Sequence, residues 1–458
     1  GTNPGYARSS RRNEVVVEFR VSRPSGPLTG VVRVPGDKSL SHRAVLFAAM
    51  AEGTSRLSGV LQSADVLSTV EAVRALGADV ELCQGNDGLA GMVAGWGSRG
   101  PTAPTAAIDC GNSGTTTRLL LGVLSGWPIS ATLIGDESLS TRPMRRVTAP
   151  LSAMGAEFDT TEGHLPVTVT GGTLRATVYE SPVASAQVKT AVLLAGLRAE
   201  GTTMVTEPAP SRDHTERLLP AFGVDVDRDS TRCAASITGP STLSATDVAV
   251  PGDPSSAAFP AIAALLVPGS KLTITDVALN PTRIGFALVL ERMGADLSIM
   301  PASDRGAEPV GTLQIRFTPV LHATTVTAEE IPSLVDEIPI LAVAAAAARG
   351  TTRFEGVGEL RVKESDRLEA IRAALAALGV TVRVDGDVLE IDGRGDAPAA
   401  DEAIFGSATL NSLGDHRLAM AWAVAGLSSA GGITVERFEA VEVSYPGFSQ
   451  DMAALGAW

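Results

Sequence analysis

Several features are scarce or missing in this 458-residue sequence, and each absence excludes a class of protein. Its three cysteines (Cys83, Cys110 and Cys233) are too few and too scattered for a disulfide framework or a zinc site, so we expect a reducing cytoplasm. Aromatic residues make up only 4%, so the cores must be built from Ala, Val, Leu and Ile. The sequence contains no run of about eighteen or more apolar residues, which excludes a membrane-spanning helix.

Positive charge is also scarce, since the formal net charge is -14. Nucleic acid is therefore not an expected partner, because duplex binding requires a basic face. A small anionic substrate is still compatible with this composition, since it depends on local charge placement. Residues 1–13 include Arg11 and Arg12, lack the apolar core of a secretion signal, and are expected to form a mobile tail.

The most informative pattern is a phrase that recurs six times: an apolar residue, a glycine and a strand-like tail. It reads LGADV, MGAEF, FGVDV, MGADL, LGVTV and LGAW, around Gly77, Gly155, Gly223, Gly294, Gly379 and Gly456. Successive glycines are separated by 78, 68, 71, 85 and 77 residues, which is too regular for chance. The sequence is therefore built from six related units.

Each unit has the same order of local signals. A polar, Gly- or Ser-rich opening precedes an Ala-rich helix, a β-branched strand, a second amphipathic helix and the repeated phrase, which predicts a βαβαββ unit. In the first unit we expect Asp65 to cap the second helix and Gly77 to end it. The buried face of that helix is expected to carry Val66, Val70 and Val73.

The six units predict an α/β protein of two domains with three units each, which suits a chain of this length. The first domain is expected to span residues 36–250 and the second residues 251–458. Residues 14–35 have strand character that no unit claims, and we expect them to complete the last sheet of the second domain. The chain would then cross between the domains twice, at Gly- and Pro-containing segments that suit a hinge.

The basic residues of this acidic chain gather at the polar openings, each of which precedes a helix. A helix N-terminus presents unpaired N–H groups and a partial positive charge, so it favours anions. The motifs GDKSLSHR, GNSGTTTR, STRPM, RVKESDR and GDHR supply Lys38, Ser39, Arg43, Gly114, Thr115, Arg118, Arg142, Lys363, Glu364, Arg367, His416 and Arg417. Together they predict a site for a small molecule with several negative charges.

Taken singly, each motif also has a plain structural interpretation. GDKSLSHR can be a capped, solvated helix start, and GNSGTTTR lacks the lysine of a P-loop. Arg145 and Arg146 are expected on a solvated face. Asp336, in the apolar helix predicted from LVDEIPILAVAAAAA, is either a cap or a functional carboxylate with a perturbed pKa, and we favour the second interpretation.

These motifs, in this order, resemble the EPSP synthase family from about Val31 to Trp458. The resemblance implies two similar domains, each an inside-out α/β barrel of three βαβαββ units, with the active site in the interdomain cleft. It also implies transfer of the enolpyruvyl group of phosphoenolpyruvate to the 5-hydroxyl of shikimate 3-phosphate by addition and elimination, without a metal or an organic cofactor. Asp336 would be the general base, and either Glu364 or Lys38 would transfer the proton at C3.

The resemblance further assigns the substrate contacts. Shikimate 3-phosphate would be held by Lys38, Ser39, Arg43, Ser185, Ala186, Gln187, Arg212, Asp336 and Lys363. Phosphoenolpyruvate would be held by Lys38, Gly114, Thr115, Arg142, Gln187, Arg367 and Arg417. We expect a monomer, because no amphipathic stretch is left over for a partner.

Two positions depart from the common pattern of that family. Many members have serine where this chain has Ala186, and a lysine where it has Val443. One hydroxyl contact and one positive charge must therefore come from elsewhere. Glyphosate-tolerant members with similar departures have alanine at the position of Gly114, so the response of this chain to glyphosate stays open.

Three alternatives were weighed against this interpretation. The enolpyruvyl transferase that acts on UDP-N-acetylglucosamine has a reactive cysteine in a mobile loop, whereas here Cys110 directly precedes GNSG and GDESLSTRP contains no cysteine. A non-catalytic anion-binding protein would have lost charged residues such as Lys38, Asp336 and Arg417. An RNA-processing relative conflicts with the net charge.

Overall fold

The computed structural model describes residues 7–11, 14–302, 306–395 and 403–458. The chain divides into two compact units. The N-terminal lobe comprises Pro35–Pro251 and a short piece ending at Glu308, and the C-terminal lobe comprises residues 1–34, 252–303 and 309–458. The expectation that all of residues 251–458 belong to one domain is therefore wrong at Glu308. Its carboxylate lies 2.6 Å from Nδ1 of His214, within the N-terminal lobe.

Six four-stranded sheets in the described part of the chain share one strand pattern. In each sheet the first strand is parallel to the second, the second is antiparallel to the third, and the third is antiparallel to the fourth. In the N-terminal lobe the orders are β15 (Val248–Ala249), β4 (Thr54–Val60), β6 (Gly88–Ala94), β5 (Asp79–Gly85); β7 (Ile108–Asp109), β8 (Ser130–Ile134), β10 (His164–Thr170), β9 (Glu157–Thr161); and β11 (Val178–Glu180), β12 (Gly201–Thr206), β14 (Ala234–Gly239), β13 (Asp227–Asp229).

The C-terminal lobe repeats the pattern three times. Its orders are β3 (Thr29–Val32), β16 (Lys271–Ala278), β18 (Val310–Arg316), β17 (Leu297–Pro301); β20 (Thr325–Val326), β22 (Thr351–Phe354), β24 (Val388–Asp392), β23 (Thr381–Asp385); and β25 (Ala408–Asn411), β26 (Ile433–Glu436), β2 (Glu14–Val21), β1 (Ala7–Arg11). A short pair, β19 (Leu321–His322) and β21 (Ala348–Arg349), lies outside the pattern. The sixfold repeat of the sequence thus corresponds to six sheets of one topology.

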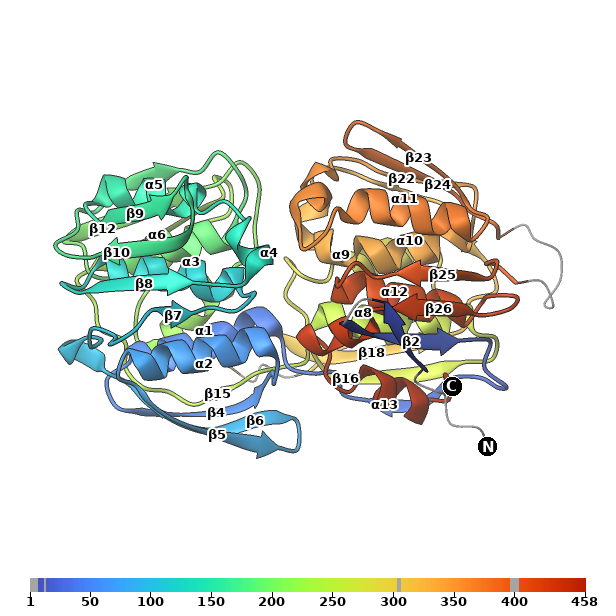
Figure 1. Ribbon diagram of the computed structural model, residues 1–458, viewed down its shortest axis with the longest axis horizontal. Helices are drawn as coiled ribbons and strands as arrows, with labels where there is room; N and C mark the ends of the chain where they lie inside the picture. The colour runs from blue at the N-terminus through green and yellow to red at the C-terminus, as the bar shows by residue number, and fades with distance from the viewer. Residues whose placement is uncertain (1–6, 12–13, 303–305, 396–402) are drawn as a thin grey trace. The chain divides into compact units, whose positions relative to one another are not determined.

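The helices that open the units lie inside the lobes, with the strands around them (Figure 1). They are α1 (Lys38–Met50), α3 (Gly114–Ser125) and α6 (Ala186–Gly196) in the N-terminal lobe, and α8 (Pro254–Leu266), α10 (Ile338–Ala346) and α12 (His416–Gly426) in the C-terminal lobe. Every residue of α8, α10 and α12 is buried. A helix that is apolar on all sides belongs in a core, which explains the Ala-rich runs.

A second set of α-helices completes the units: α2 (Ala64–Ala75), α4 (Glu137–Ser140), α5 (Arg145–Met154), α7 (His214–Leu218), α9 (Gly285–Arg292), α11 (Arg367–Ala377) and α13 (Phe448–Ala454). The 3₁₀ segments are η1 (Gly97–Arg99), η2 (Leu219–Phe222), η3 (Ile331–Ser333), η4 (Val335–Glu337), η5 (Gly358–Val362) and η6 (Phe438–Val443). Within the described ranges, no helix has both the length and the apolar character that crossing a bilayer requires.

The repeated glycines all adopt positive φ, the conformation that ends a helix at little steric cost only for glycine. Their φ angles are +96° at Gly77, +119° at Gly155, +82° at Gly223, +85° at Gly294, +84° at Gly379 and +94° at Gly456. The predicted helix stops are confirmed. The phrase that recurs in the sequence therefore marks the same kind of helix end in each of the six units.

The first outer helix, α2, has the predicted buried face but not the predicted cap. Val66, Val70 and Val73 are buried, as expected. The hydroxyl of Ser63, and not the carboxylate of Asp65, accepts the hydrogen bond from the N–H of Val66. Asp65 lies within the first turn of α2, where its carboxylate is available for another role.

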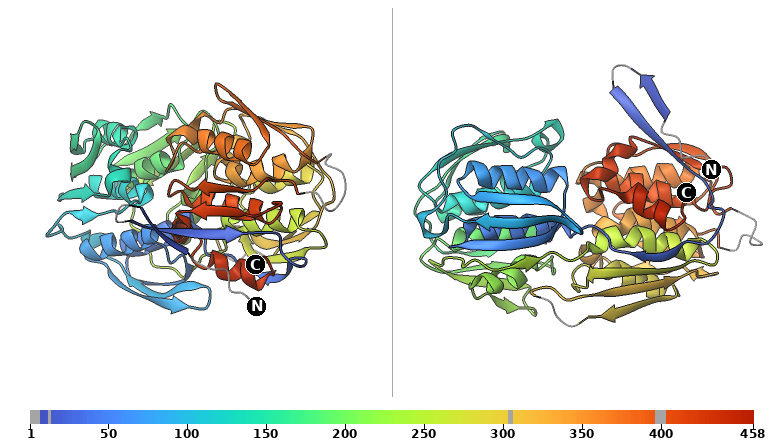
Figure 2. Two further views of the ribbon diagram at one scale, coloured as in Figure 1. Left: turned by 45° about the vertical axis from the view of Figure 1, so that its right-hand side comes forward. Right: turned by 90° about the horizontal axis from the view of Figure 1, so that it is seen from below.

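The N-terminal segment contributes to two sheets of the C-terminal lobe. Strand β2 pairs with β26 and completes the last sheet, as expected, but β3 pairs with β16 in the first sheet, so the placement of the whole of residues 14–35 in one sheet is wrong. Residues 1–6 and 12–13 of the expected tail lie outside the described residues. The remainder forms β1, which pairs with β2 in a hairpin that extends beyond β26 (Figure 2).

Candidate active site

In the N-terminal lobe, predicted site residues lie where the three buried helices begin. Lys38 is the first residue of α1, Gly114 is the first residue of α3, and Ser185 caps α6. Arg43 follows one turn into α1. Helix N-termini carry a partial positive charge, and these three supplement the side-chain cations around them.

Arg43 is buried and is held by neutral oxygen atoms. Its Nε donates to the hydroxyl of Thr215 at 2.8 Å and its Nη2 donates to the hydroxyl of Thr190 at 2.9 Å. Nη1 donates to the carbonyl of Ser39 at 3.0 Å. Burial lowers the pKa of Arg43 to about 10 against the opposing charges of Glu216 and Asp37, so the guanidinium is still charged at neutral pH. Its charge is oriented without being neutralised by a bonded carboxylate.

Gln187 joins the starts of α3 and α6. Its side-chain N–H group donates to the hydroxyl of Thr115 at 2.9 Å, and its carbonyl oxygen accepts from Arg118. The amide orientation is thereby fixed at both ends. Arg118 belongs to GNSGTTTR but is not among the predicted substrate contacts; its place four residues after Gly114, on the same helix face, is the signal that identifies it.

The guanidinium groups of Arg142 and Arg118 both lie close to Gly114. Arg142 donates to the side-chain oxygen of Asn112 at 2.6 Å. A Cβ atom added at Gly114 would lie 3.2 Å from Nη1 of Arg118 and 3.6 Å from Nη1 of Arg142. A side chain at position 114 would therefore crowd Arg118 and touch Arg142, and glycine avoids both contacts.

Lys38 forms an ion pair with Asp65 of α2. Both side chains are partly covered, with 18% of Lys38 and 10% of Asp65 exposed. The backbone carbonyl of Asp65 also accepts a hydrogen bond from Thr116 of α3. The residue that sequence analysis assigned to capping thus connects Lys38 to α3.

In the C-terminal lobe, Arg367 is the centre of a buried ion-pair network. Its side chain is 1% exposed and donates to Asp415 at 2.8 Å, Glu364 at 2.7 Å and Asp336 at 3.2 Å. Burial opposes the charged form, but Glu364, Asp415 and Asp336 together raise the pKa of Arg367. Burial likewise opposes the charge on Asp415, and Arg367 outweighs it and lowers the pKa of that carboxyl group.

Asp336 lies in the 3₁₀ turn η4, immediately before α10, and not inside the helix as expected. It is not the cap of α10, because that position is held by Glu337, whose side chain makes no capping hydrogen bond. The carboxylate of Asp336 is 16% exposed and lies near three cations: Arg367 at 3.2 Å, Arg417 at 3.8 Å and Lys363 at 4.0 Å. It is therefore oriented by positive charge and still reachable.

Every predicted site residue in the C-terminal lobe belongs to this one network. Those in the N-terminal lobe surround the starts of α1, α3 and α6, together with the loop before α7 that carries Arg212. Ala186, which replaces a common serine, is the first residue of α6. Val443, which replaces a common lysine, ends η6 and is half-buried.

Each lobe also contains supporting charges that are not among the predicted site residues. In the C-terminal lobe the hydroxyl of Ser255 donates to Glu337, and Arg283 bonds both Asp253 and Ser255 at 2.9 Å. In the N-terminal lobe Lys189 is buried within α6. A charged residue within an otherwise apolar run, as in AQVKTAVLLAG, was the signal that could have identified it.

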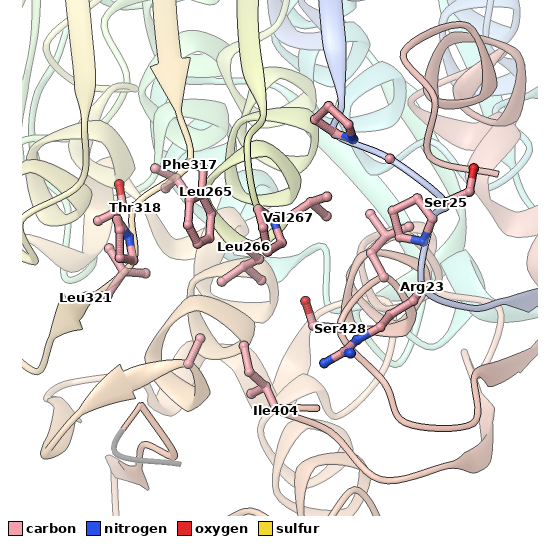
Figure 3. A pocket seen from close by; sticks show the side chains of 17 residues that line it. Arg23, Ser25, Leu265, Leu266, Val267, Phe317, Thr318, Leu321, Ile404 and Ser428 are labelled. Carbon is pink, nitrogen blue, oxygen red and sulfur yellow. The ribbon is translucent and has the colours of Figure 1, made fainter. Parts of the chain in front are cut away.

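A cavity of 360 Å³ in the C-terminal lobe lies away from these groups, where the core helices end (Figure 3). Leu265 at the end of α8, Ala347 after α10 and Leu427 after α12 are among the residues that line it. Its walls are mainly apolar, and no predicted site residue contributes to them. The charged chemistry therefore belongs to the helix starts and not to this cavity.

Comparisons with known proteins agree with this geometry. The family model described as EPSP synthase (3-phosphoshikimate 1-carboxyvinyltransferase) matches residues 22–452. A 3-phosphoshikimate 1-carboxyvinyltransferase of Acidiphilium cryptum is 49% identical over 439 residues, covering 95% of this chain and 96% of the relative. One from Methylorubrum populi is 47% identical over 444 residues, with 95% and 96% covered.

Solved structures give the same result. An EPSP synthase from Acinetobacter baumannii matches with a TM-score of 0.86 and 40% identity, covering 96% of this chain and 98% of that one. The enolpyruvyl transferase NikO from Streptomyces tendae, at 23% identity and a TM-score of 0.73, has the same fold over 96% of this chain and 97% of its own. The two-domain α/β fold of repeated units predicted from the sequence is confirmed.

Proposed function

Because the chain belongs to the EPSP synthase family, we infer that it transfers the enolpyruvyl group of phosphoenolpyruvate to the 5-hydroxyl of shikimate 3-phosphate and releases phosphate. It is a 3-phosphoshikimate 1-carboxyvinyltransferase, and its product leads to chorismate and the aromatic amino acids. The observation that carries this conclusion is the family match over residues 22–452, in a chain that has the charged groups the reaction needs.

We assign shikimate 3-phosphate mainly to the N-terminal lobe. The support is the buried charge of Arg43, which is bonded to hydroxyl and carbonyl oxygens and so keeps its attraction for a phosphate. The other residues of this set are Lys38, Ser39, Ser185, Ala186, Gln187 and Arg212, with Asp336 and Lys363 from the C-terminal lobe. Ser185 caps α6 through its hydroxyl oxygen, which leaves its O–H hydrogen for the substrate.

We assign phosphoenolpyruvate to guanidinium groups of both lobes, because their planar donor pairs suit carboxylate and phosphate. The set comprises Lys38, Gly114, Thr115, Arg142, Gln187, Arg367 and Arg417. The guanidinium groups of Arg142 and Arg118, which lie close to Gly114, support the first part of this assignment. Arg367 donates four of its five N–H groups to three carboxylates, so a contact with phosphoenolpyruvate would use the second N–H of Nη1 or replace one of these bonds.

In the proposed mechanism, Asp336 takes the proton of the 5-hydroxyl while that oxygen attacks C2 of phosphoenolpyruvate. An acid, either Glu364 or Lys38, protonates C3 and gives a tetrahedral intermediate. Loss of the proton from C3 then expels phosphate and restores the double bond. Asp336 suits the first step because its carboxylate is both accessible and oriented by Arg367, Arg417 and Lys363.

We further propose that the enzyme acts as a monomer in the cytoplasm. No dedicated partner surface was identified from the sequence pattern, and the chain has only three cysteines. Sedimentation at micromolar concentration would test the first point, and a dimer mass would contradict it.

The activity is tested by phosphate release from phosphoenolpyruvate with two acceptors, shikimate 3-phosphate and UDP-N-acetylglucosamine. We expect release with shikimate 3-phosphate and none above background with the UDP-sugar. Release with the UDP-sugar alone would contradict the proposed substrate. Glyphosate is added in a parallel reaction to determine its effect.

A further inference from the structure

Glu207 lies directly after β12 and joins two segments that the proposed function assigns to shikimate 3-phosphate. One carboxylate oxygen accepts the backbone N–H of Ser185 at 2.7 Å. The other accepts the hydroxyl of Ser211 at 2.7 Å, and Ser211 immediately precedes Arg212. The side chain of Glu207 is 2% exposed. A single buried carboxylate thus bonds the start of α6 to the loop that carries Arg212.

Glu207 forms an ion pair with Lys189, one turn into α6. Lys189 is 5% exposed and lies 2.9 Å from Glu207 and 2.7 Å from Glu216. Burial opposes the charge on Lys189, but Glu216 and Glu207 outweigh it and raise the pKa of the ammonium group. A buried carboxylate is costly unless it is paired and hydrogen-bonded, and Glu207 meets both conditions.

The contacts of Glu207 fix the distance between Ser185 and Ser211, which the chain connectivity alone does not fix. Ser185 belongs to a helix start and Ser211 to a loop 26 residues later, so only a tertiary contact holds them in register. The backbone of Glu207 is itself anchored by its N–H, which donates to the carbonyl of Cys233 at 3.0 Å. Its carboxylate is therefore a rigid clamp between the two segments.

We propose that Glu207 is a positioning residue for shikimate 3-phosphate, which holds Ser185 and Arg212 at the spacing that the substrate requires. This inference rests on the proposed function of these two residues. Glu207 does not contact the substrate in this proposal. It acts through the Ser185 backbone and the Ser211 hydroxyl, and it determines affinity for one of the two substrates.

The matched test is Glu207→Gln against Glu216→Gln. Both variants remove a carboxylate that pairs with Lys189, but Glu216 bonds Lys189 through one oxygen and its other oxygen has no hydrogen-bond partner in the described part of the chain. In Glu207→Gln one orientation of the amide places its N–H group against the N–H of Ser185, and the other places it against the ammonium of Lys189, so the clamp is disturbed in either orientation. Loss of a negative charge alone would strengthen the binding of an anion in either variant. A weaker affinity for shikimate 3-phosphate would therefore indicate that Ser185 and Arg212 are no longer correctly placed.

For Glu207→Gln we expect the KM for shikimate 3-phosphate to rise on the order of tenfold, which corresponds to one charge-assisted hydrogen bond. The KM for phosphoenolpyruvate and kcat should stay within about twofold of the wild-type values. In Glu216→Gln, kcat and the KM values for both substrates should stay within the same range. Equal rises in KM in the two variants, or no rise in Glu207→Gln, would refute the proposal. A purely structural role would lower Tm and active fraction without changing one KM selectively.

Ser211→Ala provides a milder second variant if Glu207→Gln does not fold. It removes one bond of the clamp and leaves the ion pair with Lys189, so a native Tm with a severalfold rise in the same KM is expected, and an unchanged KM refutes the proposal. Arg212→Ala distinguishes failure of the proposed function from failure of the role proposed for Glu207. A wild-type enzyme that releases no phosphate refutes the proposed function. An unchanged KM for shikimate 3-phosphate in Arg212→Ala refutes the assignment of Arg212 to the substrate phosphate. If this KM rises in Arg212→Ala but not in Glu207→Gln, only the positioning role of Glu207 is refuted.

Discussion

Two buried arginines, one in each lobe, are held by different kinds of partner. In the N-terminal lobe, Arg43 is bonded to the hydroxyl groups of Thr190 and Thr215. In the C-terminal lobe, the equally buried Arg367 is bonded to carboxylates, among them Asp336 and Asp415. Neutral partners orient a cation without cancelling its field, whereas carboxylates cancel it. The first arrangement suits binding of an anion, and the second suits a carboxylate that must be oriented for proton transfer.

The helix starts show the same difference. In the N-terminal lobe Ser113 and Ser185 cap α3 and α6, and Asp37 caps α1. In the C-terminal lobe Asp253 and Asp415 cap α8 and α12. An aspartate cap places negative charge on the positive end of the helix dipole. One repeated fold therefore provides a more positive and a more balanced set of helix starts.

The largest expected effect follows from Asp336→Asn. The variant should fold and bind shikimate 3-phosphate, and kcat should fall by about 10²–10⁴-fold, the usual range for loss of a general base. Phosphate release under saturating substrates measures it. Glu359→Gln is the control, because Glu359 also pairs with Lys363, at 2.9 Å, but is 55% exposed. Near-normal turnover in Asp336→Asn would contradict the assigned role.

The second effect is on stability and tests the carboxylate-rich network. Asp415→Asn leaves Arg367 buried with one partner charge removed, so the free energy of unfolding should fall by about 3 kcal/mol. The control, Asp392→Asn, removes a pair with Arg383 in which the side chains are 36% and 50% exposed, and should cost about 1 kcal/mol or less. Urea denaturation measures both. Equal losses would show that burial of the pair is irrelevant.

The third prediction concerns the pH dependence of stability in the N-terminal lobe, which contains the buried His42. Its ring is buried, Nδ1 lies 2.7 Å from the hydroxyl of Thr69, and burial lowers its pKa from 6.5 to about 3. The unfolded chain therefore binds a proton first as pH falls. The stabilisation is complete above pH 6.5 and is lost progressively towards pH 3, amounting to roughly 2 kcal/mol between pH 7 and pH 5.

Urea denaturation of wild type and His42→Gln at both pH values isolates this contribution, because the other titrating groups are common to the two proteins. The decrease in the free energy of unfolding from pH 7 to pH 5 should be smaller in the variant by about that amount. An identical decrease in both proteins would show that His42 is protonated in the folded enzyme.

The smallest effect concerns a neutral partner of Arg43. Thr215→Val removes a buried hydroxyl from the guanidinium and from Thr190, and should cost about 1 kcal/mol, less than Asp415→Asn. Thr202→Val, in an exposed pair with Thr238, should cost almost nothing. Urea denaturation again provides the measurement. A loss larger than that of Asp415→Asn would reverse the comparison between the lobes.

Much of the fold could be predicted from short stretches of sequence. The repeated glycines end helices because only glycine tolerates positive φ at low cost, and all six have it. The buried helices follow from their uniformly apolar composition, and the residues at their starts from the polar openings. The C-terminal members of the site were also predicted together, since RVKESDR and GDHR both stand at helix starts.

What the sequence by itself determined was the local unit, because its periodicity, caps and turns are encoded within a few neighbouring residues. Only the tertiary structure decided which distant groups meet. It paired Lys38 with Asp65, placed Glu308 on His214 and brought Glu207 to Ser185. Such contacts depend on how elements far apart in the chain pack, and no local pattern specifies which charge lies opposite another.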